Sequence, residues 1–309
     1  MELLRDLENN NPLWRYMDTS KFLDLLLHKN LVFPRFDRFE DPYEGHANHF
    51  SELVKKELAK HFGIDSSHTY GGSIFSDYVN ISNFYAYVSC WHHNKNESAG
   101  MWKLYCSTPE SLVIKTDVGA LKESLSSSEE FHLIFSKVSY DSGLEGVKIK
   151  NLKDVNVFNS LLMKRESFEH EKEYRILLID NEDRVEVLEN YQKDFEREMN
   201  NWYNQIDLEL QEIRENVSKI PKDILKEKVR NLQQSQVYIP SNTSLLEVVT
   251  KLKKERPVIR TIEIDLSILI KEIVISPYAP GWFVKTIEKL IQDLGYDFKV
   301  SQSKLYELE

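Results

Sequence analysis

The stretch Lys164-Arg-Glu-Ser-Phe-Glu-His-Glu-Lys-Glu-Tyr-Arg175 runs directly into the apolar run Ile176–Ile179. The apolar run predicts a buried strand, and residues two apart in a strand share a face. On this pattern one face of the strand carries Glu169, Glu171, Glu173 and Arg175. A row of like charges beside an apolar strand is costly unless cationic or polar groups face it. The stretch therefore indicates a functional site on a sheet.

Strands and helices are scattered through the rest of the chain, which predicts an α+β fold: a mixed, mainly antiparallel sheet core with surrounding helices. Aromatic and β-branched runs predict strands at 13–17, 31–33, 84–91, 112–115, 132–140, 261–264, 272–276 and 298–300. Periodicity and capping residues predict helices at 21–28, 47–62, 96–105, 118–125, 155–168 and 283–293. A loop is expected at 66–73.

One region departs from this pattern. From Leu188 to Val217 apolar residues recur at spacings of three and four, which predicts one long amphipathic helix. A turn at 218–221 and a second helix at 222–234 follow. We therefore expect a helical hairpin at 185–236, inserted into a main domain of residues 1–184 and 237–309. The hairpin either packs on the main domain or forms a homodimer through residues 188–234.

Composition limits the class of protein. The 309 residues carry a formal net charge of −10, which argues against a broad nucleic-acid surface. Cys90 and Cys106 lack metal or redox spacing, and this fits a reducing compartment. The first residues lack the pattern of a signal sequence, and no run approaches the roughly 20 apolar residues of a membrane span. A soluble cytoplasmic protein without a membrane partner is expected.

Glu171 and Glu173 are the candidate catalytic residues. Two carboxylates flanking one residue can divide labour, one steadying a substrate hydroxyl or an oxocarbenium-like centre and the other activating a nucleophile. The alternative is a solvated strand edge whose acids pair with Lys or Arg.

Other segments could bind a ligand. Arg15, next to Tyr16 in an apolar strand, offers a planar fork suited to phosphate or carboxylate, unless it pairs with a structural acid. The segment 91–105 brings Trp102 and Tyr105 beside a helix that begins at Ser98. Aromatic rings near exposed helix N–H groups suit a nucleotide, and an aromatic cluster with a capping serine is the alternative.

A metal site is the weaker alternative. Nitrogen and oxygen ligands could come from Asp41, Glu44, His46, His49, His92 and His93. Adjacent histidines point apart in a strand, and the set has no recognised spacing. We predict no metal, and a metal-dependent nuclease stays an alternative function.

Five segments carry a family resemblance: 13–16, 31–45, 97–105, 169–175 and 273–279. They resemble, in order, motifs of the bacterial domain-of-unknown-function family 2971. The resemblance spans most of the chain outside the helical insertion and implies little about function.

A second resemblance concerns mechanism. ADP-ribosyltransferases carry Arg or His on an early strand, Ser or Tyr on a middle strand and Glu-x-Glu on a later one. Arg15, Ser89 and Glu171-Lys172-Glu173 are similar to these positions, although the Ser-Thr-Ser signature is missing. The resemblance implies that Glu173 holds the nicotinamide ribose and supports an oxocarbenium-like transition state, while Glu171 orients the acceptor.

The resulting hypothesis is an NAD-consuming ADP-ribosyltransferase or NAD glycohydrolase, such as a bacterial toxin or defence effector. NAD would be its substrate, and its macromolecular acceptor is not indicated by the sequence. The alternative is a non-catalytic binding or regulatory module whose helical hairpin recruits a partner.

Overall fold

The computed structural model describes residues 2–3, 5–39, 41, 43–45, 71–126, 130–140, 157–235 and 243–307. They divide into two compact units, one of residues 1–181 with 257–309 and one of residues 182–256. The predicted helix at 47–62 lies outside the described residues, as do residues 66–70 of the predicted loop.

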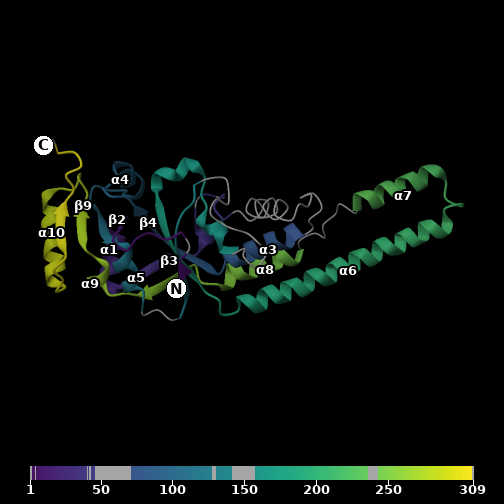
Figure 1. Ribbon diagram of the computed structural model, residues 1–309, viewed down its shortest axis with the longest axis horizontal. Coiled ribbons are helices and arrows are strands. Elements are labelled where there is room, and N and C mark those ends of the chain that lie inside the picture. The colour runs from purple at the N-terminus through teal and green to yellow at the C-terminus, as the bar shows by residue number, and fades with distance from the viewer. Residues whose placement is uncertain are drawn as a thin grey trace. The chain divides into compact units, whose positions relative to one another are not determined.

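The larger unit is built on a sheet with the strand order β1-β6-β7-β4-β2-β5-β9-β10. Three of its strands, β2, β4 and β9, are labelled in Figure 1. Neighbouring strands are antiparallel except at the two edges, where β1 pairs with β6 and β10 with β9 in parallel. The predicted α+β class with a mainly antiparallel sheet is confirmed. The strands are β1 (Glu2–Leu3), β2 (Pro12–Asp18), β4 (Ala86–His93), β5 (Ser111–Asp117), β6 (His132–Lys137), β7 (Glu173–Ile179), β9 (Glu272–Ile275) and β10 (Lys299–Gln302).

Helices and a second, two-stranded sheet complete this unit. The small sheet pairs β3 (Asn30–Pro34) with β8 (Ile259–Glu263). Its α-helices are α1 (Thr19–His28), α3 (Gly71–Asn83), α4 (Ala99–Tyr105), α5 (Val118–Ser124), α9 (Leu266–Leu269) and α10 (Gly281–Asp293). Its 3-10 helices are η1 (Phe36–Arg38), η4 (Val157–Leu162) and η5 (Glu166–Glu171).

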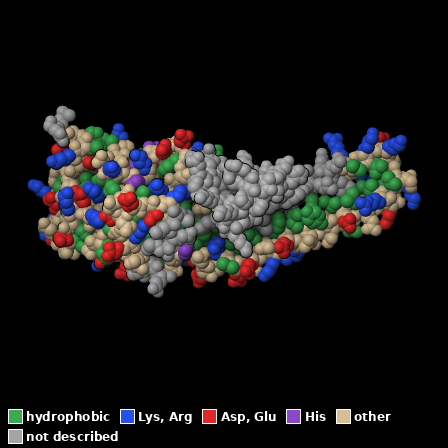
Figure 2. All heavy atoms as spheres, in the orientation of Figure 1, with side chains coloured by type: hydrophobic (Ala, Val, Ile, Leu, Met, Phe, Trp, Pro, Cys, Tyr) green, Lys and Arg blue, Asp and Glu red, His purple; other side chains and the backbone are tan. Residues whose placement is uncertain are grey.

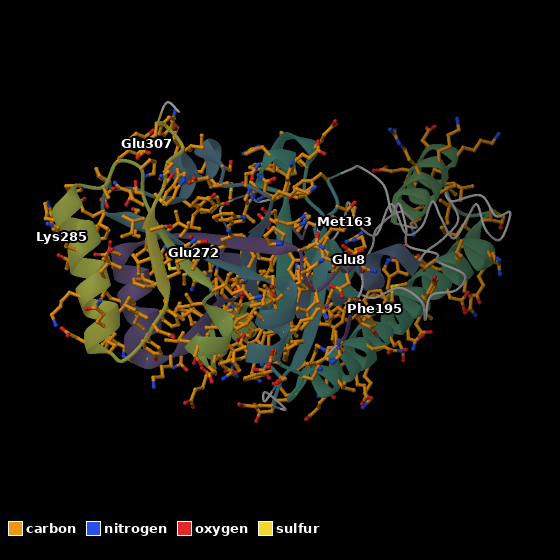
Figure 3. The ribbon with its side chains drawn as sticks, turned by 60° about the vertical axis from the view of Figure 1, so that its left-hand side comes forward. Glu8, Met163, Phe195, Glu272, Lys285 and Glu307 are labelled. Atoms are coloured by element: carbon orange, nitrogen blue, oxygen red, sulfur yellow. The ribbon has the colours of Figure 1, made fainter. Side chains whose placement is uncertain are left out.

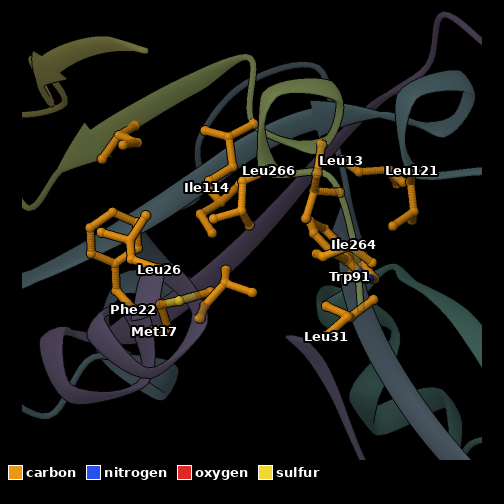
Figure 4. Close-up of a cluster of buried hydrophobic side chains, with 14 of the residues drawn as sticks. Leu13, Met17, Phe22, Leu26, Leu31, Trp91, Ile114, Leu121, Ile264 and Leu266 are labelled. Atoms are coloured by element: carbon orange, nitrogen blue, oxygen red, sulfur yellow. The ribbon is translucent and has the colours of Figure 1, made fainter. Parts of the chain in front are cut away.

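One face of the large sheet, here called the core face, packs on the main hydrophobic cluster. Alternate strand residues such as Leu13, Trp91 and Ile114 meet side chains from α1, including Phe22 and Leu26, in this cluster (Figure 4). The helices α5, α9 and α10 and the small sheet also contribute. In Figure 3, Lys285 lies on the outer side of α10, away from Glu272 of β9. This face supplies the continuous core of the unit.

The opposite face, here called the site face, carries two separate apolar clusters. One contains Val88 and Leu177 with η4, and the other contains Trp14 and Tyr16 with α4. Apolar burial is therefore interrupted on this face, and polar residues of β4 and β7 lie in the interruption.

The stretch of residues 164–179, quoted at the start, is only partly a strand. Residues Glu166–Glu171 form η5, and Lys172 then adopts a left-handed conformation with φ 41° before β7 begins at Glu173. The prediction of one strand face carrying Glu169 and Glu171 is therefore wrong. The reason is the limit of the ladder, because β4 ends at His93 and the pairing of β7 with β4 reaches no further than Glu173. Without a partner strand, the preceding residues form the 3-10 helix η5 instead.

Two further local predictions differ from the structure. The helix expected at 155–168 is replaced by the 3-10 helices η4 and η5. The loop expected at 66–73 is wrong at its described end, because α3 begins at Gly71. The remaining predicted strands and helices that fall on described residues are present, with ends shifted by a few residues.

The smaller unit is helical. It contains α6 (Arg184–Asn216), α7 (Lys222–Ser235) and α8 (Thr243–Glu255). The long helix and the second helix are thus confirmed, whereas α8 was not predicted. It packs on α6. Hydrophobic side chains form a band along α6 (Figure 2). Among the residues that the structure describes, no helix is long and apolar enough to cross a lipid bilayer.

Candidate functional site

Five charged side chains meet on the site face: Glu44, Lys164, Glu171, Glu173 and Arg175. Nζ of Lys164 lies 2.9 Å from Oε1 of Glu44 and 3.0 Å from Oε1 of Glu173, and it also contacts the carboxylate of Glu171. Nε of Arg175 lies 2.5 Å from Oε2 of Glu173, and Nη2 lies 2.6 Å from Oε2 of Glu44. Each of these side chains is at most 8% exposed. We call this group the charge cluster.

Backbone geometry and aromatic packing place Glu44 in the cluster. Gly45 follows it with φ 65°, and a Cβ there would lie 2.5 Å from the ring of Phe36. Only glycine tolerates both the left-handed conformation and this close approach. The Phe36 ring stacks on that of Phe39, and the guanidinium of Arg175 lies over both rings. The turn that carries Glu44 is therefore seated beside β7.

The pKa values of Glu171 and Glu173 are shifted in opposite directions. Burial and a hydrogen bond to Glu173 raise the pKa of Glu171 to about 7, against the opposing effect of Lys164. Burial also opposes ionisation of Glu173, but Arg175, Glu171 and Lys164 outweigh it and lower the pKa of Glu173 well below its ordinary value. Near neutral pH Glu173 is thus ionised while Glu171 exchanges a proton. Carboxyl pairs with divergent pKa values are typical of acid–base sites.

The number of charges in the cluster explains why the pKa of Glu171 is raised while that of Glu173 is lowered. Three carboxylates face two cations, so full ionisation would leave one excess negative charge out of water. A proton on Glu171 removes that excess. The attraction of Glu173 and its neighbours raises the pKa values of Lys164 and Arg175, despite burial, and both remain charged.

Two phenols and a thiol lie near the carboxyl pair. The hydroxyl of Tyr140 accepts a 2.7 Å hydrogen bond from the backbone N–H of Glu173. Burial and the Glu173 charge raise the pKa values of Tyr140 and of the Cys90 thiol. Burial and the charges on Glu171 and Glu173 likewise raise the pKa of Tyr105. All three groups therefore stay protonated, and Cys90 is no thiolate nucleophile.

Tyr105 is partly exposed and feels the charges of the cluster. It ends α4 and is 42% exposed overall, although its pKa responds to Glu171 and Glu173. The helix is fixed from its start, since Oγ of Ser98 accepts a hydrogen bond from the N–H of Met101. Among the binding residues predicted from the sequence, Tyr105 is thus one whose pKa responds to the carboxyl pair.

Tyr16 and Trp102 lie on the same face but pack on each other. Their ring centroids are 5.1 Å apart, and both side chains are buried. The Tyr16 hydroxyl accepts a 2.8 Å hydrogen bond from the N–H of Ser98, and Nε1 of Trp102 donates to Glu97 at 3.0 Å. This arrangement matches the aromatic cluster with a capping serine that the sequence left open.

Arg15 and Ser89 lie on the core face, opposite Glu173. Arg15 alternates with Leu13 and Met17 of the main core, and its guanidinium lies 5.5 Å from the centroid of Trp91. Burial lowers the pKa of Arg15 to about 10. Ser89 accepts a hydrogen bond from Nε1 of Trp91. A cleft joining Arg15, Trp102 and Glu173 is therefore not formed, because pleating sends Arg15 to the other side.

The candidate metal ligands are engaged elsewhere or not described. Asp41 pairs with Arg165, and Glu44 pairs with Lys164 and Arg175. His46 and His49 lie outside the described residues.

The two adjacent histidines point to opposite faces of the sheet. Nδ1 of His92 lies 2.6 Å from the backbone O of Glu171, and Nε2 of His93 lies 3.1 Å from Oδ1 of Asn11. Within the described ranges, no group of three or more His, Cys, Asp or Glu side chains is placed to hold a metal.

Residues 101–176 match the family model DUF2971, a protein of unknown function. The expected resemblance to DUF2971 is thus confirmed over this segment, which runs from α4 into β7 and includes Lys164, Glu171, Glu173 and Arg175. Comparison with curated proteins and with solved structures gave no match. The family description names no activity, so the function is argued from the site.

Four members of the site were not among the catalytic or binding residues that the sequence predicted. Lys164 and Arg175 stand in the quoted stretch itself, but a residue's partners do not follow from neighbouring position alone. Glu44 was expected only as a possible metal ligand, whereas its carboxylate pairs with two cations in the structure. Nothing in the sequence signalled Tyr140.

Proposed function

We propose that this protein is an enzyme that cleaves the glycosidic bond of NAD, as an ADP-ribosyltransferase or NAD glycohydrolase, with Glu173 and Glu171 as catalytic residues. The observation that carries the proposal is the carboxyl pair, in which Glu173 is held ionised while the pKa of Glu171 is about 7. A cytoplasmic toxin or defence effector is the setting that we propose.

The pair supplies two distinct functions. When the bond between ribose C1 and the nicotinamide nitrogen breaks, nicotinamide leaves with the bonding electrons as a neutral ring. The ionised Glu173 stabilises the positive charge that develops on the ribose. Water or an acceptor hydroxyl forms the new C1–O bond and gives its proton to the ionised fraction of Glu171. A base with a pKa near the working pH suits this transfer.

Sheet topology supports this choice of reaction. The resemblance to ADP-ribosyltransferases concerns three strands, and β7, β4 and β2 are neighbours in the sheet. The departures are Arg15 and Ser89, which lie on the core face. Lys164 and Arg175 are the cations that face Glu173 instead, and they hold it ionised rather than leaving it to pair with an early-strand arginine.

The test is incubation of labelled NAD with the wild-type protein, alone and with cell lysate. Glu173→Gln removes the charge, and Tyr105→Phe removes the hydroxyl of a half-exposed residue. Glu169→Gln is the matched control, because Glu169 is exposed in the same segment. We expect nicotinamide release or label transfer by the wild type and by Glu169→Gln, and a loss of about 100-fold or more in Glu173→Gln. Folded wild-type protein that consumes no NAD would refute the proposal.

The second candidate is a non-catalytic binding module. It is favoured by the smaller unit, where large hydrophobic residues are exposed on α6 and α7, among them Tyr203, Leu208, Ile224 and Val229. Deletion of residues 188–234 separates the two functions. Intact NAD turnover with lost partner binding supports the enzyme, while lost oligomer mass in a protein without turnover supports the module.

A further inference from the structure

His92 lies beside the carboxyl pair, and one of its ring nitrogens has no hydrogen-bond partner among the residues that the structure describes. The residue is 3% exposed. Its Nδ1 lies 2.6 Å from the backbone O of Glu171, and since that oxygen can only accept, Nδ1 carries the proton. Its Nε2 is buried and has no hydrogen-bond partner within the described part of the chain. Nδ1 thus has a structural hydrogen bond, whereas Nε2 makes none with the described residues.

The register of the sheet places His92 at the centre of the site face. It stands directly opposite Glu173 of β7 and opposite Trp14 of β2. The Tyr16 ring meets the imidazole edge-on, with centroids 6.1 Å apart. His92 therefore lies between the charge cluster and the aromatic cluster of β2 and α4.

The protonation state gives Nε2 its chemistry. Burial lowers the pKa of His92, and the charges on Lys172 and His170 act in the same direction. The ring is therefore neutral near pH 7, and Nε2 presents a lone pair that can only accept. A buried acceptor left unpaired is costly, so natural proteins rarely keep one without a reason.

We propose that His92 is a substrate-binding residue whose Nε2 accepts a hydrogen bond from a hydroxyl or amide N–H of the molecule on which Glu171 and Glu173 act. This inference rests on the proposed function, for which NAD supplies both kinds of donor: ribose hydroxyls and the nicotinamide amide. The hydrogen bond would hold the ligand beside Glu173 and would lock the imidazole through Nδ1.

Two substitutions separate the two ring nitrogens. Asparagine places an N–H near the position of Nδ1 and has no atom at Nε2, so His92→Asn keeps the bond to Glu171 and loses the acceptor. Glutamine reaches the position of Nε2 with its carbonyl oxygen, so His92→Gln keeps the acceptor and loses the inner bond. A purely structural histidine would give the same order of melting temperatures, but NAD binding would then be kept in His92→Asn and would weaken only in His92→Gln, where the inner bond is lost.

The experiment titrates NAD into the wild type and both variants by calorimetry and records each melting temperature. We expect His92→Asn to weaken NAD binding about tenfold or more with little change in melting temperature. We expect His92→Gln to keep NAD binding within a few-fold while its melting temperature falls. A parallel titration with nicotinic acid adenine dinucleotide, whose carboxylate has no N–H, identifies the donor: weakening in both titrations indicates a ribose hydroxyl, and weakening with NAD alone indicates the amide.

The outcomes separate this inference from the proposed function. Wild-type affinity in His92→Asn, with NAD still bound, overturns the role of His92 alone. A wild-type protein that binds no NAD overturns both. If His92→Asn fails to fold, nitrogen NMR of labelled histidine in the wild type decides the matter. An Nε2 signal unmoved by NAD overturns the inference, and a shift characteristic of hydrogen-bond acceptance supports it.

Discussion

Arg175 and Glu173 form an ion pair from which water is excluded, with Nε of the guanidinium 2.5 Å from Oε2 of the carboxylate. Both belong to β7, two residues apart, and the same strand face directs them to the charge cluster. Breaking such a pair leaves an uncompensated buried charge, whereas exposed pairs contribute little. The charge cluster should therefore respond to substitution very differently from the surface around it.

Glu173→Gln should destabilise the protein by about 3–5 kcal/mol, because Arg175 and Lys164 lose one of the two carboxylates that they share. Urea unfolding followed by circular dichroism measures this. Glu169→Gln, in the same segment but exposed, should change the free energy of unfolding by less than about 0.5 kcal/mol. Equal effects of the two substitutions would contradict the buried network.

Lys164→Met and Arg165→Met compare adjacent cations in different surroundings. Lys164 is 6% exposed and forms ion pairs with three carboxylates, whereas Arg165 is 52% exposed and pairs with Asp41. We expect a loss of about 3–5 kcal/mol for Lys164→Met and of about 1 kcal/mol or less for Arg165→Met. Both values come from denaturant unfolding, and an Arg165 effect as large as that of Lys164 would be inconsistent with this geometry.

The raised pKa of Glu171 predicts a pH dependence of stability. In the unfolded chain the carboxyl ionises near its ordinary 4.5, whereas in the folded protein it ionises near 7. Between these values the unfolded chain binds fewer protons, so this group's contribution to stability is full below about pH 4.5 and is lost as pH rises towards 7. Glu173, with its lowered pKa, contributes in the opposite sense, since its stabilisation is lost as pH falls.

Glu171→Gln isolates the first contribution, because the amide stays neutral at every pH. The stability of the variant should fall less than that of the wild type between pH 4.5 and 7. Unfolding free energies measured across that range provide the comparison. Identical slopes for variant and wild type would show that Glu171 ionises normally in the folded state.

Replacing residues 182–256 by a short Gly/Ser linker should leave the larger unit folded. The chain leaves and re-enters this unit beside β4: the N–H of Asp180 donates to the backbone O of Tyr85, and the hydroxyl of Tyr87 donates to the backbone O of Pro257. Asp180 also pairs with Arg260. We expect cooperative unfolding of the shortened protein in circular dichroism, and a non-cooperative transition would show that the junction needs the insertion.

The same variant tests one of the two alternatives for the helical hairpin, a homodimer through residues 188–234. Light scattering should give a dimer mass for the full chain and a monomer mass for the shortened one. A monomeric full chain would show that this prediction was wrong.

The sheet could be predicted because its strands combine apolar and β-branched residues over short runs with clear ends. The long helix α6 could be predicted because its apolar spacing persists over many turns. The failure was local: the Glu-rich stretch has strand-like alternation, but the pairing of β7 with β4 reaches no further than Glu173. A ladder is a property of two segments, and one segment's sequence does not state where the other ends.

The faces of Arg15 and Ser89 were beyond sequence reasoning for a related reason. Both β2 and β4 are buried on both sides, so apolar residues occupy odd and even positions alike. An odd or even position along such a strand therefore does not indicate which face of the sheet holds a site. Glu171 and Glu173 were identifiable because charged residues beside an apolar run are rare. Glu44 joins them from a distant part of the chain, which only the fold reveals.

The junction beside β4 bears on how this chain has been able to change. Because Asp180 and Pro257 are anchored to Tyr85 and Tyr87, the ends of the insertion meet at one place on the sheet. A segment gained, lost or lengthened there alters no strand order and no residue of the charge cluster. A chain with a different segment at this point could thus keep both the sheet and the charge cluster unchanged.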